Sequence, residues 1–201
     1  KIVAGSNASV ILNGGGKITG YKYDDGNTLA ASVTGNSTLT ATNVDFTGDF
    51  KAKEGSKIIL KGGSVTASDY YENGKKDGYT EFGAIGENSS IEADGVDIKS
   101  ATLATDGAKV TIKNSNINTV EGIWAARKGT INLDGKATYT ASGEGVEAAD
   151  GGVININGGT LHTTNISVEG NGSKFITDGS VEAQKIVAGS NASVILNGGG
   201  K

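Results

Sequence analysis

The fold is decided by residues 151–163, which read GGVININGGTLHT, and by their counterparts GSKIILKGGSVTA at 55–67 and GAKVTIKNSNINT at 107–119. In each stretch apolar residues alternate with other residues over a short run, which predicts a β-strand with one buried face. A Gly or Asn closes the run, and these residues adopt positive φ at the lowest cost. The pattern therefore predicts short strands separated by tight corners.

The first buried residue of this pattern, which we call the anchor, returns along the chain at intervals of 19 to 33 residues with a mean of 23. The anchors are Val10, Leu39, Ile58, Ile91, Val110, Ile131, Ile154, Phe175 and Val194. The residue four places later is always Gly or Asn, at Gly14, Asn43, Gly62, Gly95, Asn114, Gly135, Gly158, Gly179 and Gly198. We expect a corner with positive φ at each of these positions.

Each anchor strand is followed by two more strands before the next anchor. The second strand has an inward residue six to eight places after the anchor, at Ile18, Phe46, Val65, Ile98, Ile117, Tyr139, Leu161 and Val181. The third has inward pairs such as Phe50 and Ala52, Ile123 and Ala125, and Val146 and Ala148. The sequence thus predicts an all-β fold: a right-handed parallel β-helix, or β-solenoid, of about eight to nine coils of roughly 19–23 residues.

The two ends of the chain carry the same sequence. Residues Lys1 to Lys17 read KIVAGSNASVILNGGGK, and residues Lys185 to Lys201 repeat all 17 letters at an offset of 184. We interpret 1–201 as one solenoid segment, with 1–184 as one long tandem repeat unit and 185–201 as the start of the next identical unit. Whether the duplication is natural or engineered is left open by the sequence.

Composition excludes several classes of protein. The chain has no Cys and a single His, so it has no disulfide framework, no thiolate site and no two-histidine metal site of its own. The formal net charge is -4, with one arginine, which predicts no nucleic-acid partner. No apolar run approaches the roughly 18 residues of a membrane-spanning helix, so we expect no membrane insertion of this segment. We predict neither a cofactor nor a metal.

Two long intervals between anchors mark insertions, which cover about residues 20–28 (with YKYDDGN) and about 68–82 (SDYYENGKKDGYTEF). Five of the six tyrosines lie in them, at Tyr21, Tyr23, Tyr70, Tyr71 and Tyr79, and Asp24 and Asp25 lie beside the first pair. Tyrosine gives large contact area at low entropic cost, so we take these residues as candidate binding residues. We expect the insertions to leave consecutive coils at comparable corners and to form one patch. The alternative is that they pack on each other or cover a flank.

Trp124 is a further candidate binding residue. Because Ile123 and Ala125 alternate inward, the side chain of Trp124 is expected to point outward, near Arg127 in sequence. An exposed indole beside a cation can stack on a sugar ring or on a partner's side chain. The alternative is that the indole shields the corner or packs beneath a loop.

Acidic residues give no clear catalytic or metal pattern. Those of the two insertions have the oxygen ligands that Ca²⁺ prefers, but they match no known ligand spacing, so we interpret them as solvated charges. Outward carboxylates such as Asp45, Asp97 and Asp134 are scattered along the sequence, and a glycosidase needs two held together. His162 is expected to point outward as an ordinary surface residue. We predict that the chain is not an enzyme.

The stretches GVEAADGGVININGGTLHT, GNGSKFITDGSVEA and GIWAARKGTINLDG together resemble the passenger region of pertactin-like bacterial autotransporter adhesins. The resemblance lies in the composition of the coils, which are rich in Gly and Ala and contain no Cys. It covers nearly the whole chain. The RGD tripeptide known in pertactin is missing. The resemblance implies a pectin-lyase-like right-handed β-helix, at the bacterial cell surface or secreted, that serves adhesion or aggregation.

From these observations we expect a stiff adhesin stalk that binds through its insertions. The expected partners are a host-cell glycan or protein, or identical chains that self-associate by end-to-end stacking, since a solenoid without caps exposes unpaired strand edges. The alternative is an inert structural filament or surface-layer spacer without a ligand. A polysaccharide-active enzyme is the third possibility.

Overall fold

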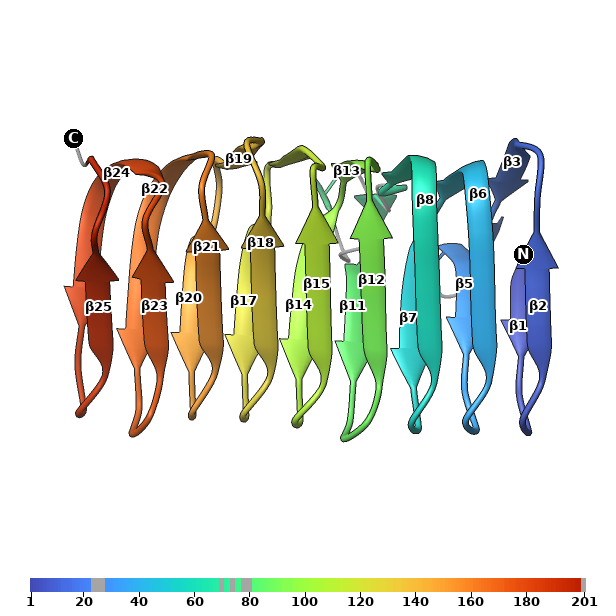
Figure 1. The fold of residues 1–201 in the computed structure, drawn as a ribbon, viewed down its shortest axis with the longest axis horizontal. Helices are drawn as coiled ribbons and strands as arrows, with labels where there is room; N and C mark the ends of the chain where they lie inside the picture. Colours follow the sequence, from blue (N-terminus) through green and yellow to red (C-terminus); the bar gives the residue numbers. More distant parts are fainter. Residues whose placement is uncertain (23–27, 69–70, 73–74, 77–80, 200–201) are drawn as a thin grey trace.

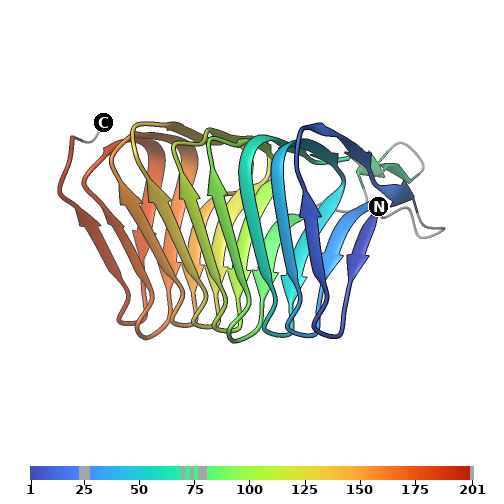
Figure 2. The same cartoon turned by 45° about the vertical axis from the view of Figure 1, so that its right-hand side comes forward.

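The computed structural model describes residues 1–22, 28–68, 71–72, 75–76 and 81–199. These residues form a right-handed parallel β-solenoid, with the N-terminus at one end of the rod and the C-terminus at the other (Figures 1 and 2). No helix occurs among the described residues. The predicted fold class is therefore confirmed.

Each coil contributes one strand, or half of a longer strand, to each of three faces. The first face contains β2 (Ser9–Leu12), the first halves of β6 (Thr38–Thr47) and β8 (Lys57–Thr66), then β12 (Ser90–Asp94), β15 (Lys109–Lys113), β18 (Thr130–Asp134), β21 (Val153–Asn157), β23 (Lys174–Thr177) and β25 (Ser193–Leu196). The second face contains β3 (Gly16–Thr19), the second halves of β6 and β8, then β13 (Asp97–Lys99), β16 (Ile117–Thr119), β19 (Thr138–Ala141), and the first halves of β22 (Thr160–Glu169) and β24 (Ser180–Ala188).

The third face completes each coil before the next anchor strand begins. It contains β1 (Ile2–Ala4), β5 (Thr28–Val33), β7 (Asp49–Lys53), β11 (Glu81–Ile85), β14 (Ala101–Thr105), β17 (Gly122–Ala126), β20 (Gly145–Ala149) and the second halves of β22 and β24. Three short strands belong to the insertions: β4 (Tyr21–Lys22), β9 (Tyr71–Glu72) and β10 (Lys75–Lys76). Among the described strands, only the pairings of β4 with β5 and of β9 with β10 are antiparallel.

The sequence period coincides with the pairing register of the first face. Every anchor is the Cα partner of the next anchor, from Val10 with Leu39 to Phe175 with Val194. The inward residues of the second face pair in the same way, for example Ile117 with Tyr139. Nine strands therefore stack on the first face, which is near the predicted eight to nine coils. The eight spacings between these strands, of about 4.8 Å each, make a rod of about 38 Å.

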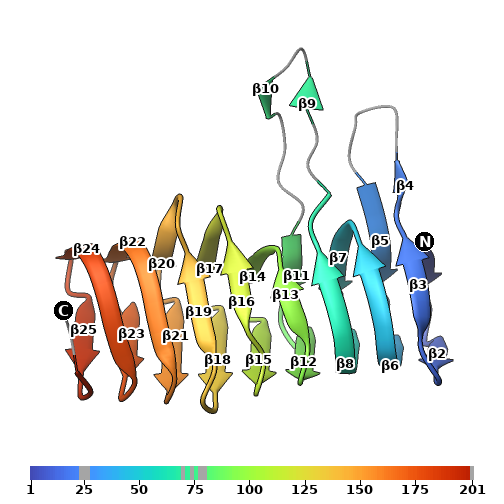
Figure 3. The same ribbon diagram turned by 90° about the horizontal axis from the view of Figure 1, so that it is seen from above.

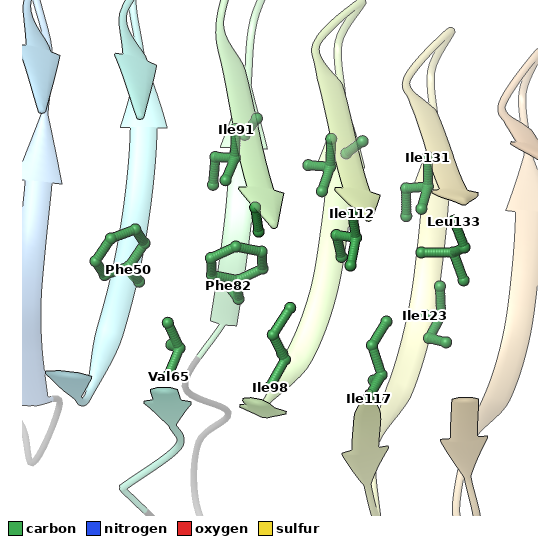
Figure 4. Close-up of a cluster of buried hydrophobic side chains, with 14 of the residues drawn as sticks. Phe50, Val65, Phe82, Ile91, Ile98, Ile112, Ile117, Ile123, Ile131 and Leu133 are labelled. Carbon is green, nitrogen blue, oxygen red and sulfur yellow. The ribbon is translucent and has the colours of Figure 1, made fainter. Parts of the chain in front are cut away.

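The core is a continuous column of apolar side chains enclosed by the three faces. Figure 4 shows this core, where Phe50 and Phe82 from the third face meet isoleucines of the other two. The ring centroids of Phe50 and Phe82 lie 5.6 Å apart, and those of Phe46 and Phe50 lie 4.8 Å apart. Burial of each such large side chain is worth about 1.5–3 kcal/mol, so the stacked columns drive the association of successive coils.

The predicted corners are confirmed at seven of the nine Gly or Asn positions. Positive φ occurs at Gly14, Asn43, Gly62, Gly95, Asn114, Gly135 and Gly158. The prediction is wrong for Gly179 and Gly198, which do not have positive φ. Glycine is needed there for space: a Cβ on Gly179 would lie 2.7 Å from the carbonyl oxygens of Gly158 and Gly159, and one on Gly198 would overlap the backbone of Gly179.

Candidate functional site

Both insertions leave the solenoid at the corner between the second and the third face, which we call the insertion corner (Figure 3). The first insertion begins after β3, where β4 pairs with the start of β5, as Tyr21 with Leu29 and Lys22 with Thr28. The second insertion lies between β8 and β11, and its short β9–β10 ladder lies away from the stacked coils. The expectation of comparable corners is therefore confirmed.

The expectation of consecutive coils is wrong, because one regular corner lies between the two insertions. There the chain passes from β6 to β7 through Gly48, whose φ is 119°. The amide of Gly48 donates a hydrogen bond to the carbonyl of Thr66 at 2.9 Å, and the amide of Gly20 donates to the carbonyl of Thr47 at 2.7 Å. A Cβ on Gly48 would lie 2.6 Å from the carbonyl oxygen of Thr28, so the corner is tight. The insertions thus emerge two coils apart, about 10 Å along the axis.

The candidate tyrosines lie only partly within the described residues. Tyr21 is exposed, with 60% of its surface accessible, and the ammonium of Lys1 lies 5.2 Å from the centroid of its ring. This distance allows a cation–π interaction. Tyr71 lies in β9, where its backbone pairs with Lys76. The remaining candidates of the insertions lie outside the described residues: Tyr23, Asp24, Asp25, Tyr70 and Tyr79.

An ionic cluster lies where the second insertion returns to the solenoid. The ammonium of Lys51 lies 3.3 Å from a carboxylate oxygen of Asp49 and 3.2 Å from one of Glu81. The other oxygen of Asp49 accepts a hydrogen bond from the Glu81 amide at 2.7 Å, which ties the first residue of β11 to β7. Burial alone would lower the pKa of Lys51, but the two carboxylates outweigh it and the pKa is raised. Sequence reasoning missed this cluster, because Glu81 reaches Asp49 and Lys51 only through the pairing of β7 with β11.

Trp124 points outward from β17, as predicted, between the inward Ile123 and Ala125. Its neighbours along the outer surface of the third face are Leu103 on one side and Glu147 on the other. The indole is half-buried, because its Cε2 and Nε1 atoms cover Gly122 so closely that a Cβ there would overlap them. Packing against the backbone therefore uses part of the surface that a ligand would need.

Arg127 has its charged partner in the preceding coil. Its guanidinium donates two hydrogen bonds to the carboxylate of Asp106, at 2.6 and 3.0 Å. These hydrogen bonds are the main reason why the pKa of Asp106 is lowered and the pKa of Arg127 is raised. The pair lies on the corner between the third and the first face, beside a hollow of about 470 Å³ that Lys128 and Asp150 also line. The cation beside Trp124 in the sequence is thus held by a neighbouring carboxylate.

The outward carboxylates are distributed over different faces. Asp45 and Asp97 both lie on the second face but Ser64 separates them, and its hydroxyl donates to Asp45 at 2.8 Å. Asp134 lies on the first face and accepts a hydrogen bond from Asn157. The described residues contain no group of three or more His, Asp or Glu side chains placed to hold a metal ion. His162 points outward, with Nδ1 2.9 Å from a carboxylate oxygen of Glu182.

A second hollow, of about 360 Å³, lies on the first face over β8, β12 and β15. It is lined by three lysines and two carboxylates, Lys61, Lys109, Lys113, Glu92 and Asp94, with Thr111. Charges of opposite sign alternate here across neighbouring strands, as Lys61, Asp94 and Lys113 do, and such pairs favour one register. The hollow lies on the first face, away from the insertion corner, and was not predicted, because it depends on which strands stack.

Comparison with known proteins identifies no family for this chain. No protein-family model, no curated protein and no solved structure matches the chain. No helix among the described residues is long and apolar enough to cross a membrane. What is shown is an all-parallel β-solenoid built from degenerate coils.

Proposed function

We propose that the chain is a rod segment of a pertactin-like autotransporter adhesin, secreted or held at a bacterial cell surface, that binds a host-cell glycan or protein through its insertion corner. The observation that supports this proposal is the position of the insertions. Both leave an otherwise regular solenoid at the same corner, only two coils apart. Their tyrosines supply the kind of rigid, amphipathic contact surface that binding loops use.

The rod itself suits a stalk. Each coil is paired only with the coil before it and the coil after it, so stability adds up along the axis and length can grow without a new fold. If units of 184 residues follow one another, the insertion corner recurs about every 38 Å on one side of the rod. Weak sites spaced in this way gain avidity because neighbouring sites are presented together.

An inert spacer is the second candidate, and two contacts favour it. The indole of Trp124 already covers Gly122, and the ring of Tyr21 already has the Lys1 ammonium beside it. Both side chains then contribute to packing at the end and on the flank of the rod. In that case the protein would hold another module away from the cell and would have no ligand of its own. We propose no catalytic role for the chain.

The test compares the chain with a variant in which Tyr21, Tyr23, Tyr70, Tyr71 and Tyr79 are all replaced by Ser. Each protein is coated on beads at matched density, and capture of epithelial cells and of immobilised glycans is scored. A matched control replaces three outward residues of the first face by Ser, at Thr111, Asn132 and Asn155. Circular dichroism and the thermal midpoint are recorded for all three proteins, so that lost binding is separated from lost folding.

If the insertions bind the ligand, the parent and the control should capture cells or glycans. The tyrosine variant should lose this capture while its thermal midpoint stays unchanged. Capture that survives in the tyrosine variant would place binding elsewhere on the rod. A variant that unfolds would mean that the insertions pack on the solenoid. No capture by the parent at the highest bead density would leave the spacer as the function.

A further inference from the structure

Four lysines occupy the corners of a rectangle of outward positions on the first face. β8, β12 and β15 lie side by side in the middle of the rod, and their neighbours β6 and β18 continue the face on either side (Figure 1). The pairing register brings Lys57 of β8 level with Lys109 of β15. It brings Lys61 level with Lys113 in the same way. Lysines at the same level are two strand spacings apart, about 10 Å, and lysines on the same strand are four residues apart, about 13 Å.

The hollow of about 360 Å³ opens between three of these lysines, Lys61, Lys109 and Lys113, which we call the hollow lysines. All three side chains are exposed. Leu60 and Ala93 also line the hollow but point into the core, so the space between the lysines reaches down to the backbone of β8 and β12. The volume falls within the range of about 300–1,000 Å³ that is usual for small-ligand sites.

The hollow lysines are not neutralised by the two carboxylates beside them. An oxygen of Glu92 lies 2.7 Å from the ammonium of Lys57. An oxygen of Asp94 accepts a hydrogen bond from the side-chain amide of Asn114 at 3.1 Å. No ion pair joins a hollow lysine to another described residue. Three ammonium groups therefore line the hollow without a bonded counter-charge, although the chain as a whole has a formal net charge of -4.

We infer that this hollow binds an acidic glycan, whose sulfate or carboxylate groups contact the hollow lysines. Because the lysines are spread over about 10–13 Å, they suit charges carried along a short chain of sugars better than a single small anion. Glu92 and Asp94 keep carboxylate oxygens to which the hydroxyl groups of a sugar can donate. Ile59 also lines the hollow and offers an apolar contact for the carbon face of a sugar ring.

A glycan is favoured over a strand of nucleic acid. Proteins that bind single strands stack the bases on aromatic side chains, and no aromatic side chain is among the described residues that line this hollow. The carboxylates of Glu92 and Asp94 would also repel the phosphates that follow one another along a nucleic-acid backbone, whereas a sugar can turn its hydroxyl groups towards them. The inference does not rest on the insertions, so it adds a second binding surface to the rod.

The alternative is that the hollow lysines only hold the strands in register through the opposite charges of β12. Lysines with that role should contribute to the stability of the fold. Exposed lysines without a bonded partner contribute little to stability, so their replacement should leave the thermal midpoint unchanged. Binding and stability measured on the same variant therefore separate the two roles.

The experiment measures binding by fluorescence anisotropy at low ionic strength, with labelled hexasaccharides of heparin, hyaluronan and maltose units and with a single-stranded oligothymidylate. Heparin carries sulfate and carboxylate groups, hyaluronan carries carboxylate groups alone, and maltohexaose is neutral. The hollow variant combines Lys61→Gln, Lys109→Gln and Lys113→Gln. The matched control replaces three exposed lysines outside the hollow by Gln, at Lys99, Lys136 and Lys174, so both variants change the net charge equally. Circular dichroism and the thermal midpoint are recorded for every protein.

We expect the parent and the control to bind acidic hexasaccharides and not maltohexaose. The hollow variant should bind at least about tenfold more weakly at an unchanged thermal midpoint, which is the combined effect of three exposed ion pairs. Affinity should fall between about 0.01 M and 0.15 M salt, because salt screens exposed charges. Binding of heparin alone identifies sulfate as the recognised anion, and binding of hyaluronan as well shows that carboxylate suffices.

Three results would overturn the inference: a parent that binds neither acidic glycan, a control weakened as much as the hollow variant, or oligothymidylate bound as tightly as heparin. A lower thermal midpoint with unchanged binding would assign the hollow lysines to strand register instead. If the triple variant does not fold, the three single replacements give the same comparison. The five tyrosine replacements should leave this binding unchanged, so its failure is distinguishable from failure of the proposed adhesion through the insertion corner.

Discussion

Replacing Tyr139 by Phe should stabilise the protein. Tyr139 lies in β19 on the inner surface of the second face, stacked between Ile117 and Leu161, and is fully buried. Its hydroxyl is also buried and has no hydrogen-bond partner among the described residues. A buried hydroxyl that has lost its bonds to water costs about 1–3 kcal/mol, and the substitution removes that cost without opening a cavity.

The same hydroxyl makes stability depend on pH in the alkaline range. Burial, helped by the nearby charge of Asp134, raises the pKa of Tyr139 from 10.0 to about 12. Above pH 10 the unfolded chain loses this proton whereas the folded chain keeps it, so the unfolded state is favoured as pH rises. The free energy of unfolding is therefore unaffected by this proton below pH 10. It falls progressively between pH 10 and pH 12, by about 3 kcal/mol in total.

The assay is chemical denaturation of the parent and of Tyr139→Phe at pH 7 and at steps between pH 9 and pH 11. The difference between the two free energies of unfolding isolates Tyr139, because every other titrating group is common to both proteins. We expect Tyr139→Phe to be more stable by about 1–3 kcal/mol at pH 7, with a difference that widens as pH rises above 10. A less stable variant at pH 7, or a difference that is constant with pH, would contradict this prediction.

Two further predictions concern glycines. Gly122→Ala should push the indole of Trp124 off the backbone and into water. The fluorescence emission of this single tryptophan should then shift to longer wavelength, while the thermal unfolding transition stays cooperative. An unchanged emission spectrum would contradict the packing of the indole on Gly122. Gly63→Ala and Gly95→Ala both place Ala at positive φ, which costs about 1–2 kcal/mol. Only the Cβ at Gly63 would overlap the backbone of Val44, so Gly63→Ala should lower the thermal midpoint by several degrees more, and equal shifts would mean that backbone strain alone matters.

The coil and its register follow from local patterns in the amino-acid sequence. The anchors, the inward residues of the second face and the outward direction of Trp124 all follow from alternation along a strand, which is a local property. Seven of the nine corners follow from a local property too, the low cost of positive φ for Gly and Asn. Because each coil repeats these local signals and contacts only its neighbours, the pairing of distant residues could be predicted by aligning the repeats.

The contacts between outward side chains depend on how the coils stack. Arg127 bonds to Asp106, His162 contacts Glu182, and Lys51 contacts Asp49 and Glu81. Alignment of the coils brings these residues close together, but it does not say which neighbouring outward side chains bond to each other. The corner through Gly48 between the two insertions, the crowding at Gly179 and the unpartnered hydroxyl of Tyr139 also depend on how one coil sits on the next. The physical reason is that inward positions are constrained in every coil by the shared core, whereas an outward side chain is constrained only by the neighbours that stacking brings beside it.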